Sequence, residues 1–161
     1  MVTLRRMSAA EFATWWDITI RSHAEQLSRA TGHPLAAELD AARELLPQVL
    51  VDGVDTSGMH FFAVEAAHER VGWLWIGAAP GDQPAGFVWD IIIDDAARGR
   101  GHGRATMVAA EQFFVEQGMA RITLQVATGN DVARRLYESL GYEVVTTNGP
   151  MTTMAKALPS G

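Results

Sequence analysis

The sequence predicts one α/β domain over residues 1–161, with a central sheet flanked by helices, and three observations support this. The 161 residues are 48% hydrophobic, enough to bury one sizeable core but too few for two ordinary domains. Segments rich in β-branched and aromatic residues are interspersed with segments whose apolar residues recur at helical spacing. In the second half, a strand, a glycine-rich loop, a helix and a strand come in that order, which implies a parallel crossover.

The first fifty residues are expected to form a strand and two helices. Residues 2–6 are the strand. Ser8, with Glu11 three residues later, is the pattern of a helix N-terminus, and it opens a helix with an apolar face. The second helix begins near Pro34 and ends at about residue 49, because proline is tolerated in a first helical turn.

The rest of the chain is expected to add six strands and two helices. The strands are residues 59–67, 71–79, 86–93, 121–126, 142–147 and 151–158. The polar turn His68-Glu69-Arg70 joins the first two as a hairpin, and Gly81-Asp82-Gln83-Pro84 breaks the chain before the third. One helix follows the glycine-rich loop and stops at Gly118, and the other spans residues 131–140 with Gly141 as its stop signal.

Composition argues against several classes of function. A formal net charge of -6 argues against a nucleic-acid binder, which needs a basic face. Without cysteine the chain has neither disulfides nor a thiolate metal site, and acyl transfer cannot pass through a cysteine. The histidines lack metal-ligand spacing, so no metal is expected. Because there is no signal-peptide pattern and no run of about 18 apolar residues, we expect a cytoplasmic protein without membrane association.

The glycine-rich loop Arg98-Gly99-Arg100-Gly101-His102-Gly103 joins an apolar strand to a helix. Glycines permit a sharp turn and leave N–H groups bare, and a helix N-terminus adds partial positive charge, so this arrangement suits phosphate binding. Two nucleotide motifs do not fit it. A Walker loop needs Gly-Lys-Ser/Thr, whereas Arg104 and Ala105 follow here, and the third glycine comes one residue too early for the dinucleotide fingerprint.

The pattern Arg98-x-x-Gly101-x-Gly103 resembles the corresponding motif of the GNAT superfamily of N-acetyltransferases. The resemblance covers residues 71–158. Besides the loop, it includes residues 90–94 upstream of the loop and, downstream of it, the pattern Asn130-x-x-Ala133-x-x-Leu136-Tyr137-Glu138-x-x-Gly141-Tyr142. It implies a mixed, mostly antiparallel sheet with splayed central strands. It also implies direct transfer of the acetyl group of acetyl-CoA to a primary amine.

The resemblance further implies that acetyl-CoA binds along this loop and the strand before it. Backbone N–H groups of residues 100–105 would receive the pyrophosphate, and pantetheine would pair with residues 91–93 at a strand edge freed by a β-bulge near Asp90. A side chain at Gly101 or Gly103 would block the pyrophosphate. The implied cofactor-binding residues are Ile91, Ile92, Ile93, Arg98, Gly99, Arg100, Gly101, His102, Gly103, Arg104, Ala105, Asn130, Ala133, Arg134 and Tyr137.

Tyr137 and Asp90 are the predicted catalytic residues. The resemblance places Tyr137 beside the CoA sulfur, where a phenol can act as the acid; the alternative is a core tyrosine on the buried helix face. Asp90 lies in an apolar run and is the candidate base, directly or through water, or else a structural carboxylate at the bulge. Alternation places Asp90 and Ile92 on one face of the strand and Trp89 on the other. Asn130 is a helix N-cap, a contact to pantetheine, or both.

The resemblance implies that the acceptor enters opposite CoA, over the first two helices, the loop after them and neighbouring strands. Acidic residues outnumber basic ones there and lie near tryptophans, which favours a small, cationic amine bound by Trp16, Glu25 and Asp90. The alternative for Trp16 and Glu25 is a core residue and a solvated helix face. Two other functions stay open, a catalytically silent acyl-CoA-binding sensor or interaction protein and a protein or peptide N-acetyltransferase. The resemblance also leaves a homodimer open.

Overall fold

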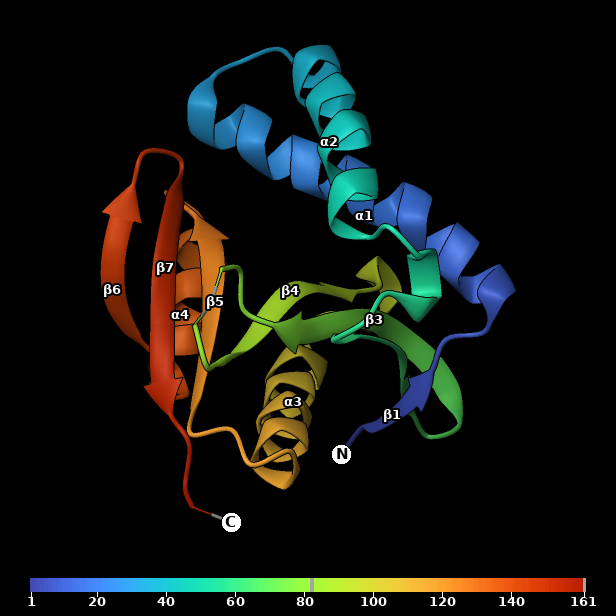
Figure 1. The fold of residues 1–161 in the computed structure, drawn as a ribbon, viewed down its shortest axis with the longest axis vertical. Helices are drawn as coiled ribbons and strands as arrows, with labels where there is room; N and C mark the ends of the chain where they lie inside the picture. The colour runs from blue at the N-terminus through green and yellow to red at the C-terminus, as the bar shows by residue number, and fades with distance from the viewer. Residues whose placement is uncertain (82, 161) are drawn as a thin grey trace.

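The computed structural model describes residues 1–81 and 83–160, which form one seven-stranded sheet with helices on both faces (Figure 1). The strand order is β1-β2-β3-β4-β5-β7-β6, and only the β4–β5 pair is parallel among the strands described. The strands are β1 (Thr3–Arg6), β2 (Met59–Ala66), β3 (Glu69–Ala78), β4 (Gly86–Ile93), β5 (Arg121–Ala127), β6 (Glu143–Asn148) and β7 (Met151–Ala157). The predicted mixed, mostly antiparallel sheet is confirmed.

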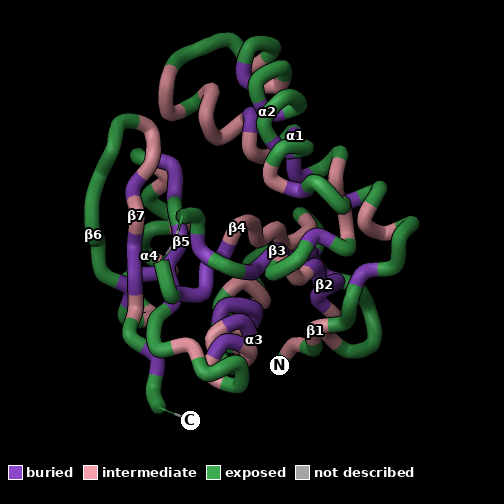
Figure 2. The backbone as a smooth tube through the Cα atoms, viewed as in Figure 1, coloured by how far each residue is buried: buried purple, intermediate pink, exposed green. Residues whose placement is uncertain are grey.

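The helices lie in two layers, one on each face of the sheet. They are α1 (Ala9–Thr31), α2 (Leu35–Val49), α3 (His102–Glu116) and α4 (Asp131–Ser139), with 3₁₀ turns η1 (Gly53–Asp55) and η2 (Asp95–Ala97) between elements. α1 and α2 pack on the face that carries Trp73 and Trp75, whereas Leu74 packs on the opposite face with Met107 of α3 and Tyr137 of α4. Figure 2 shows buried residues along the central strands and on α3, while β6 is exposed along its length.

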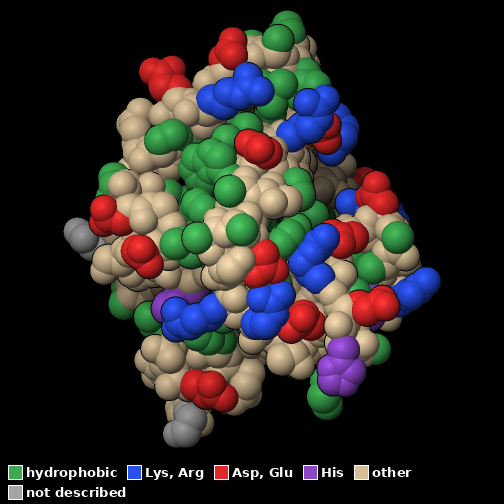
Figure 3. Space-filling model, turned by 90° about the vertical axis from the view of Figure 1, so that its right-hand side faces the viewer, with side chains coloured by type: hydrophobic (Ala, Val, Ile, Leu, Met, Phe, Trp, Pro, Cys, Tyr) green, Lys and Arg blue, Asp and Glu red, His purple; other side chains and the backbone are tan. Residues whose placement is uncertain are grey.

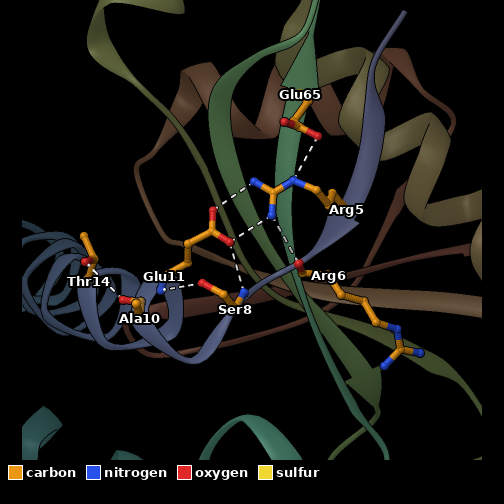
Figure 4. A network of polar contacts seen from close by, with 7 residues as sticks. All are labelled: Arg5, Arg6, Ser8, Ala10, Glu11, Thr14 and Glu65. Carbon is orange, nitrogen blue, oxygen red and sulfur yellow. Dashed lines mark hydrogen bonds and ion pairs between the residues drawn. The ribbon is translucent and has the colours of Figure 1, made fainter.

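The start of α1 is fixed to the sheet by a polar network (Figure 4). Ser8 and Glu11 form the predicted capping box, each side chain accepting a hydrogen bond from the other residue's backbone N–H. The Arg5 guanidinium of β1 donates to both Glu11 carboxylate oxygens at 2.9 Å and to Glu65 of β2 at 3.1 Å. Hydrogen bonds from Arg5 and then Ser8 lower the pKa of Glu11 to about 2. The network therefore sets where α1 enters the face of the sheet.

The predicted elements agree with the observed ones to within two residues at each bound, and the hairpin between β2 and β3 shows the largest shift. Its turn consists of Ala67 and His68, with φ of 51° and 68°, rather than His68, Glu69 and Arg70. Two-residue turns with positive φ match the twist of paired strands, so Glu69 and Arg70 extend β3 instead. In the predicted break before β4, Asp82 lies outside the described residues.

β4 changes its pairing part-way along its length. Trp75 of β3 pairs with Asp90, whereas the residue after Trp75 pairs with Val88, which leaves Trp89 as the extra residue of a β-bulge. On its other side, β4 pairs with β5 only from Gly86 to Val88. The two strands diverge beyond that point, so the predicted bulge near Asp90 and the predicted splay of the central strands are both confirmed.

The bulge overturns one predicted side-chain direction. Trp89 stacks on Trp75 with 5.0 Å between ring centroids, on the face covered by α1 and α2. Simple alternation predicted Trp89 on the face opposite Asp90, and this is wrong because the extra residue interrupts the alternation. Ile92 lies on the α1 and α2 face, and Ile91 lies on the α3 face, as predicted.

Candidate active site

A cavity of about 370 Å³ lies where β4 and β5 diverge. Side chains from both helix layers line it, including Thr19 of α1 and Tyr137 of α4, together with Asp90 of β4 and Leu124 of β5. Helices on opposite faces of the sheet reach the same space because the two strands have parted. The two predicted catalytic residues therefore line one cavity.

Asp90 is a partly buried carboxyl group held from α1. The Thr19 hydroxyl donates a hydrogen bond to Asp90 Oδ2. Burial raises the pKa of Asp90 to about 6, although donation from Thr19, the Trp15 indole and the Ile91 backbone opposes this rise. The fully buried Trp15 Nε1 lies near the carboxyl but makes no hydrogen bond that meets the usual distance and angle limits. At pH 7 Asp90 is therefore mostly ionised and far more basic than an exposed aspartate.

Tyr137 is buried on the inner side of α4. Burial first, and then the negative charge of Asp90, raise the pKa of Tyr137 to about 12. The phenol consequently keeps its proton at neutral pH, which suits a hydrogen-bond donor or an acid. Tyr137 and Asp90 both line the cavity, so one bound molecule can contact both.

The glycine-rich loop turns from β4 into α3 as the motif requires. Gly99 and Gly101 have φ of 77° and 81°, in the left-handed region that favours glycine. Gly101 is the N-cap of α3, and Ala105 makes the first hydrogen bond of the helix to the Gly101 carbonyl. The N–H groups of the first turn, from His102 onward, therefore have no partner within the helix. A helix N-terminus of this kind binds anions.

The Arg98 side chain folds back onto its own loop. Its Nε donates to the Ile93 carbonyl at 3.1 Å, and its Nη1 pairs with Asp95 at 3.0 Å. These contacts use the guanidinium to shape the turn between β4 and α3. Arg98 was predicted to bind the cofactor, and this structure gives it a part in building the loop.

The edge of β4 that faces the gap is formed by alternate residues. The Asp94 N–H donates to the Val71 carbonyl of β3. Because main-chain groups alternate along a strand, those of Ile92 also point to β3, and those of Ile91 and Ile93 point to the gap. Ile92, predicted as a cofactor contact, therefore has its main chain occupied within the sheet. Ile91 also lines the cavity.

Comparison with known proteins identifies the family. Residues 15–142 match the family model described as the Acetyltransferase (GNAT) family. The chain belongs to this family. It is 29% identical over 145 residues to the uncharacterized N-acetyltransferase YycN of Bacillus subtilis (strain 168), covering 88% of this chain and 92% of that protein. The crystal structure of YycN matches with a TM-score of 0.85 at 25% identity, over 92% of this chain and 96% of that chain.

Two further matches to this acetyltransferase are a full-length match at low identity and a match to part of a longer protein. A spermidine N-acetyltransferase from Vibrio cholerae, solved with CoA and spermine, has a TM-score of 0.68 at 19% identity over 99% of this chain and 96% of that chain, which shows a shared fold. A mycothiol acetyltransferase of Thermobispora bispora is 37% identical over 86 residues, covering 51% of this chain and 29% of that protein. The predicted GNAT fold and N-acetyltransferase family are thus confirmed.

The helix after β5 is positioned by its cap. Asn130 Oδ1 accepts a hydrogen bond from the Ala133 N–H at 3.3 Å, so the predicted N-cap of α4 is present. Asn130 and Ala133 both line the cavity of the acetyltransferase, which keeps their predicted contact to pantetheine open. Arg134 instead pairs with Glu138 at 2.9 Å on the exposed side of α4.

The structure corrects the predicted acceptor site on α1. Among the described residues that line the cavity, neither Trp16 nor Glu25 occurs. Trp16 stacks on Phe12 with 5.9 Å between ring centroids, and Glu25 pairs with Arg21 at 3.2 Å. Successive helical residues point about 100° apart, so Glu25 leaves α1 on another side than Thr19. Trp16 lies on the same side of α1 as Thr19 but nearly one turn closer to the helix start, where it packs on Phe12.

Thr19, Gln26 and Leu27 of α1 line the cavity and were not predicted, whereas His23, which also lines it, belongs to the stretch expected to hold the acceptor. Thr19, His23 and Gln26 lie at i, i+4 and i+7, which is one stripe along a helix. Burial lowers the pKa of His23, and the negative charge of Glu38 partly offsets this, so the imidazole is neutral at pH 7. The spacing of these polar residues, on a helix whose buried positions include Trp15, was the signal that could have found them.

Three further observations concern the described residues outside the cavity. In residues 1–81 and 83–160, no helix is long and apolar enough to cross a membrane. The same residues hold no group of three His, Cys, Asp or Glu side chains arranged to bind a metal ion. Among the described side chains drawn in Figure 3, basic and acidic groups are interspersed over that face. Positive charge there is balanced locally by negative charge.

Proposed function

We propose that this acetyltransferase transfers the acetyl group of acetyl-CoA directly to the primary amine of a small molecule bound in the cavity. The observation that carries the proposal is that Asp90 and Tyr137 line one cavity where β4 and β5 diverge. Its volume of about 370 Å³ lies near the lower end of the range for small-molecule sites. The negative charge of Asp90 also acts on the Tyr137 hydroxyl, so both groups can serve one reaction.

The residues of the loop and the free strand edge fit acetyl-CoA. The first N–H groups of α3 would receive the pyrophosphate, and Ile91 and Ile93 would offer main-chain groups to the pantetheine arm. The Ile93 carbonyl already accepts from Arg98, and the Ile91 N–H lies against the Asp90 carboxyl, so the Ile93 N–H and the Ile91 carbonyl are the groups available. An added Cβ at Gly103 would contact Leu136 and Ile93. The start of α3 thus adjoins the two elements that supply Ile91 and Tyr137 to the cavity.

In this proposal Asp90 and Tyr137 divide the proton transfers. The amine nitrogen forms a bond to the thioester carbonyl carbon, and its proton passes to Asp90, directly or through water. An alkyl ammonium has a pKa near 10. Raising the pKa of the Asp90 carboxyl from 3.8 to about 6 brings it closer to that of the amine, which makes Asp90 a better proton acceptor. As the C–S bond breaks, Tyr137 donates to the departing sulfur. The products are an amide and the thiol of CoA.

A turnover assay tests the function. The protein is incubated with acetyl-CoA and a panel of small amines, and release of free thiol is followed together with the mass of the acetylated product. Thiol release that requires the amine supports the proposal. Acetyl-CoA binding without turnover on any amine would favour a catalytically silent acyl-CoA sensor, and turnover on peptides alone would favour a peptide acetyltransferase.

A side chain at Gly101 is expected to weaken acetyl-CoA binding at least tenfold. Gly101 is the N-cap of α3 with φ of 81°, so valine there both strains the left-handed backbone and stands before the free N–H groups. The dissociation constant is measured by calorimetry for Gly101→Val and wild type at low and high salt. Binding to the wild type should weaken as salt rises, because the ligand carries phosphate charges.

The matched control for this prediction lies at the other end of α3. Gly118 has φ of 76°, and an added Cβ would meet nothing within 4 Å, as at Gly101. Gly118→Val therefore imposes similar backbone strain far from the loop and should leave acetyl-CoA affinity near wild type. Equal affinities in Gly101→Val and wild type would show that the pyrophosphate binds elsewhere.

Thr19 is expected to act as a positioning residue for Asp90. Its hydroxyl donates to Asp90 Oδ2 and favours the ionised carboxylate. Thr19→Val removes this donor, so the acid limb of the kcat–pH profile should move upward by about one pH unit. Thr14→Val is the control, because Thr14 donates to the Ala10 carbonyl on an exposed face of the same helix. A profile that moves equally in both variants, or in neither, would contradict this role.

A further inference from the structure

Opposite the polar stripe of α1, one wall of the cavity is apolar. α2 contributes Leu45 and Val49, and the sheet contributes Trp75 and Trp89. The two indole rings stack with 12° between their planes. The Trp89 N–H donates to the Ala78 carbonyl at 3.1 Å, so its polar group is already satisfied and its ring is held in place. This wall offers a bound molecule rigid apolar contacts and few hydrogen bonds.

One carboxylate lines the cavity. Asp90 is the only one among the described lining residues, and no acidic side chain of α1 or α2 is among them. Glu25 pairs with Arg21 at 3.2 Å, and Glu38, whose charge acts on His23 from outside the lining, is held by His33 at 3.0 Å. The excess of acid that predicted a cationic acceptor therefore lies outside the cavity lining.

A second ammonium group would find no anion inside the cavity. Asp90 serves the reacting nitrogen, and His23 is neutral at pH 7 because burial lowers its pKa. Burial of an unpaired charge is costly, and the tryptophan faces attract a cation more weakly than a carboxylate does. The cavity therefore disfavours acceptors that carry a second positive charge next to their apolar body.

We infer that the acceptor is a monoamine with an apolar body, an alkyl or arylalkyl amine, rather than a polyamine. The inference rests on the proposed function, since it takes Asp90 as the group that meets the reacting nitrogen. It narrows the cationic acceptor expected from sequence to one whose only cationic group is the amine that reacts. The spermidine acetyltransferase of Vibrio cholerae shares the fold of this chain, but the acceptor is selected here by the lining of this cavity.

A matched pair of amines tests the inference. n-Hexylamine and 1,6-diaminohexane present the same reacting group on the same chain and differ in the second ammonium. With acetyl-CoA saturating, kcat/KM for n-hexylamine should exceed that for 1,6-diaminohexane by at least tenfold, and 2-phenylethylamine should also exceed spermidine. Equal values, or a preference for the diamine or spermidine, would overturn the inference.

A new carboxylate in the apolar wall should change this selectivity. Leu45 lines the cavity and is 53% exposed, so Leu45→Glu can be introduced without disrupting the core. It should lower the ratio of kcat/KM for n-hexylamine over 1,6-diaminohexane at least fivefold. Val51→Glu is the control, because Val51 is 72% exposed and lies outside the cavity lining. An unchanged ratio in a Leu45→Glu variant with wild-type Tm would overturn the placement of the acceptor body.

Failure of the proposed function gives a different result from failure of this inference. If no amine is acetylated while acetyl-CoA still binds, the proposed function is refuted. Calorimetric titration with the same two amines then decides the inference by itself. Tighter binding of n-hexylamine than of 1,6-diaminohexane supports an apolar monoamine site, and the reverse order overturns it.

Discussion

Replacement of Tyr137 by Phe is expected to lower kcat about ten- to a thousandfold with little change in acetyl-CoA affinity. Burial and the charge of Asp90 raise the pKa of Tyr137 to about 12. The phenol therefore stays protonated and can donate to the sulfur as negative charge develops there. Phe keeps the ring packing and removes only this donor. kcat is measured by thiol release with both substrates saturating, and the dissociation constant by calorimetry.

Tyr142→Phe controls for the loss of a buried hydroxyl near the same place. The Tyr142 ring lies 6.0 Å from that of Tyr137, and its hydroxyl donates to Glu111 at 3.2 Å. This variant should keep kcat near wild type, because its hydroxyl is bound to Glu111 of α3 and Tyr142 does not line the cavity. The absence of a burst would show that chemistry limits the rate. If Tyr137→Phe then has the kcat of wild type, water or another group is the acid.

Much of the fold could be predicted because it depends on local patterns. The Ser8 cap, the glycine-rich loop and the Asn130 cap each act on their own few residues, so their sequence signatures were sufficient. The parallel crossover followed from the order of the elements. Tyr137 and Asp90 were predicted from the family motif and its spacing, and the structure brings both to one cavity.

The remaining features depend on contacts between elements distant in the sequence. Trp89 changes face because β3 pairs with the residues around it, which alternation along β4 cannot show. The packing of α1 on the sheet decides which face and which turns of the helix meet the cavity, so Thr19 lines it, Glu25 lies on another face and Trp16 lies nearer the helix start. Composition indicated an acidic N-terminal region, but only the fold shows which acid enters the site.

Asp90→Asn is expected to lower kcat at pH 7 by about a hundred- to ten-thousandfold. The amide cannot accept the proton of the attacking amine. The loss should shrink as pH approaches the pKa of the amine, because the neutral amine then no longer needs a base to the same extent. In the wild type, kcat should rise with pH through about 6, the pKa to which burial raises Asp90. A wild-type profile in Asp90→Asn would assign the base to another group, with His23 the next candidate in the cavity.

The same substitution is expected to stabilise the fold, and the sign follows from the pKa. Burial raises the pKa of Asp90 from its ordinary value of 3.8, which applies to the unfolded chain, to about 6 in the folded chain. Below the lower value both states are protonated and the folded state bears no cost. As pH rises through the interval, the unfolded chain loses its proton first and the folded state becomes relatively less stable. Above about pH 6 the accumulated loss levels off at about 3 kcal/mol.

Asn carries no such charge, so the free energy of unfolding of Asp90→Asn should exceed that of wild type by about 2.5 kcal/mol more at pH 8 than at pH 4, since about 0.5 kcal/mol of the loss has already accumulated at pH 4. Urea unfolding of both proteins at the two pH values measures this difference, and other titrating groups cancel because both chains share them. The Thr19 hydroxyl can still donate to the amide oxygen, so no new unpaired donor confuses the comparison. If the free energies of unfolding of the two proteins differ by the same amount at both pH values, Asp90 has the same pKa in the folded and unfolded chain. Burial of its carboxylate would then cost the fold no stability, and the raised pKa proposed to serve proton transfer would be absent.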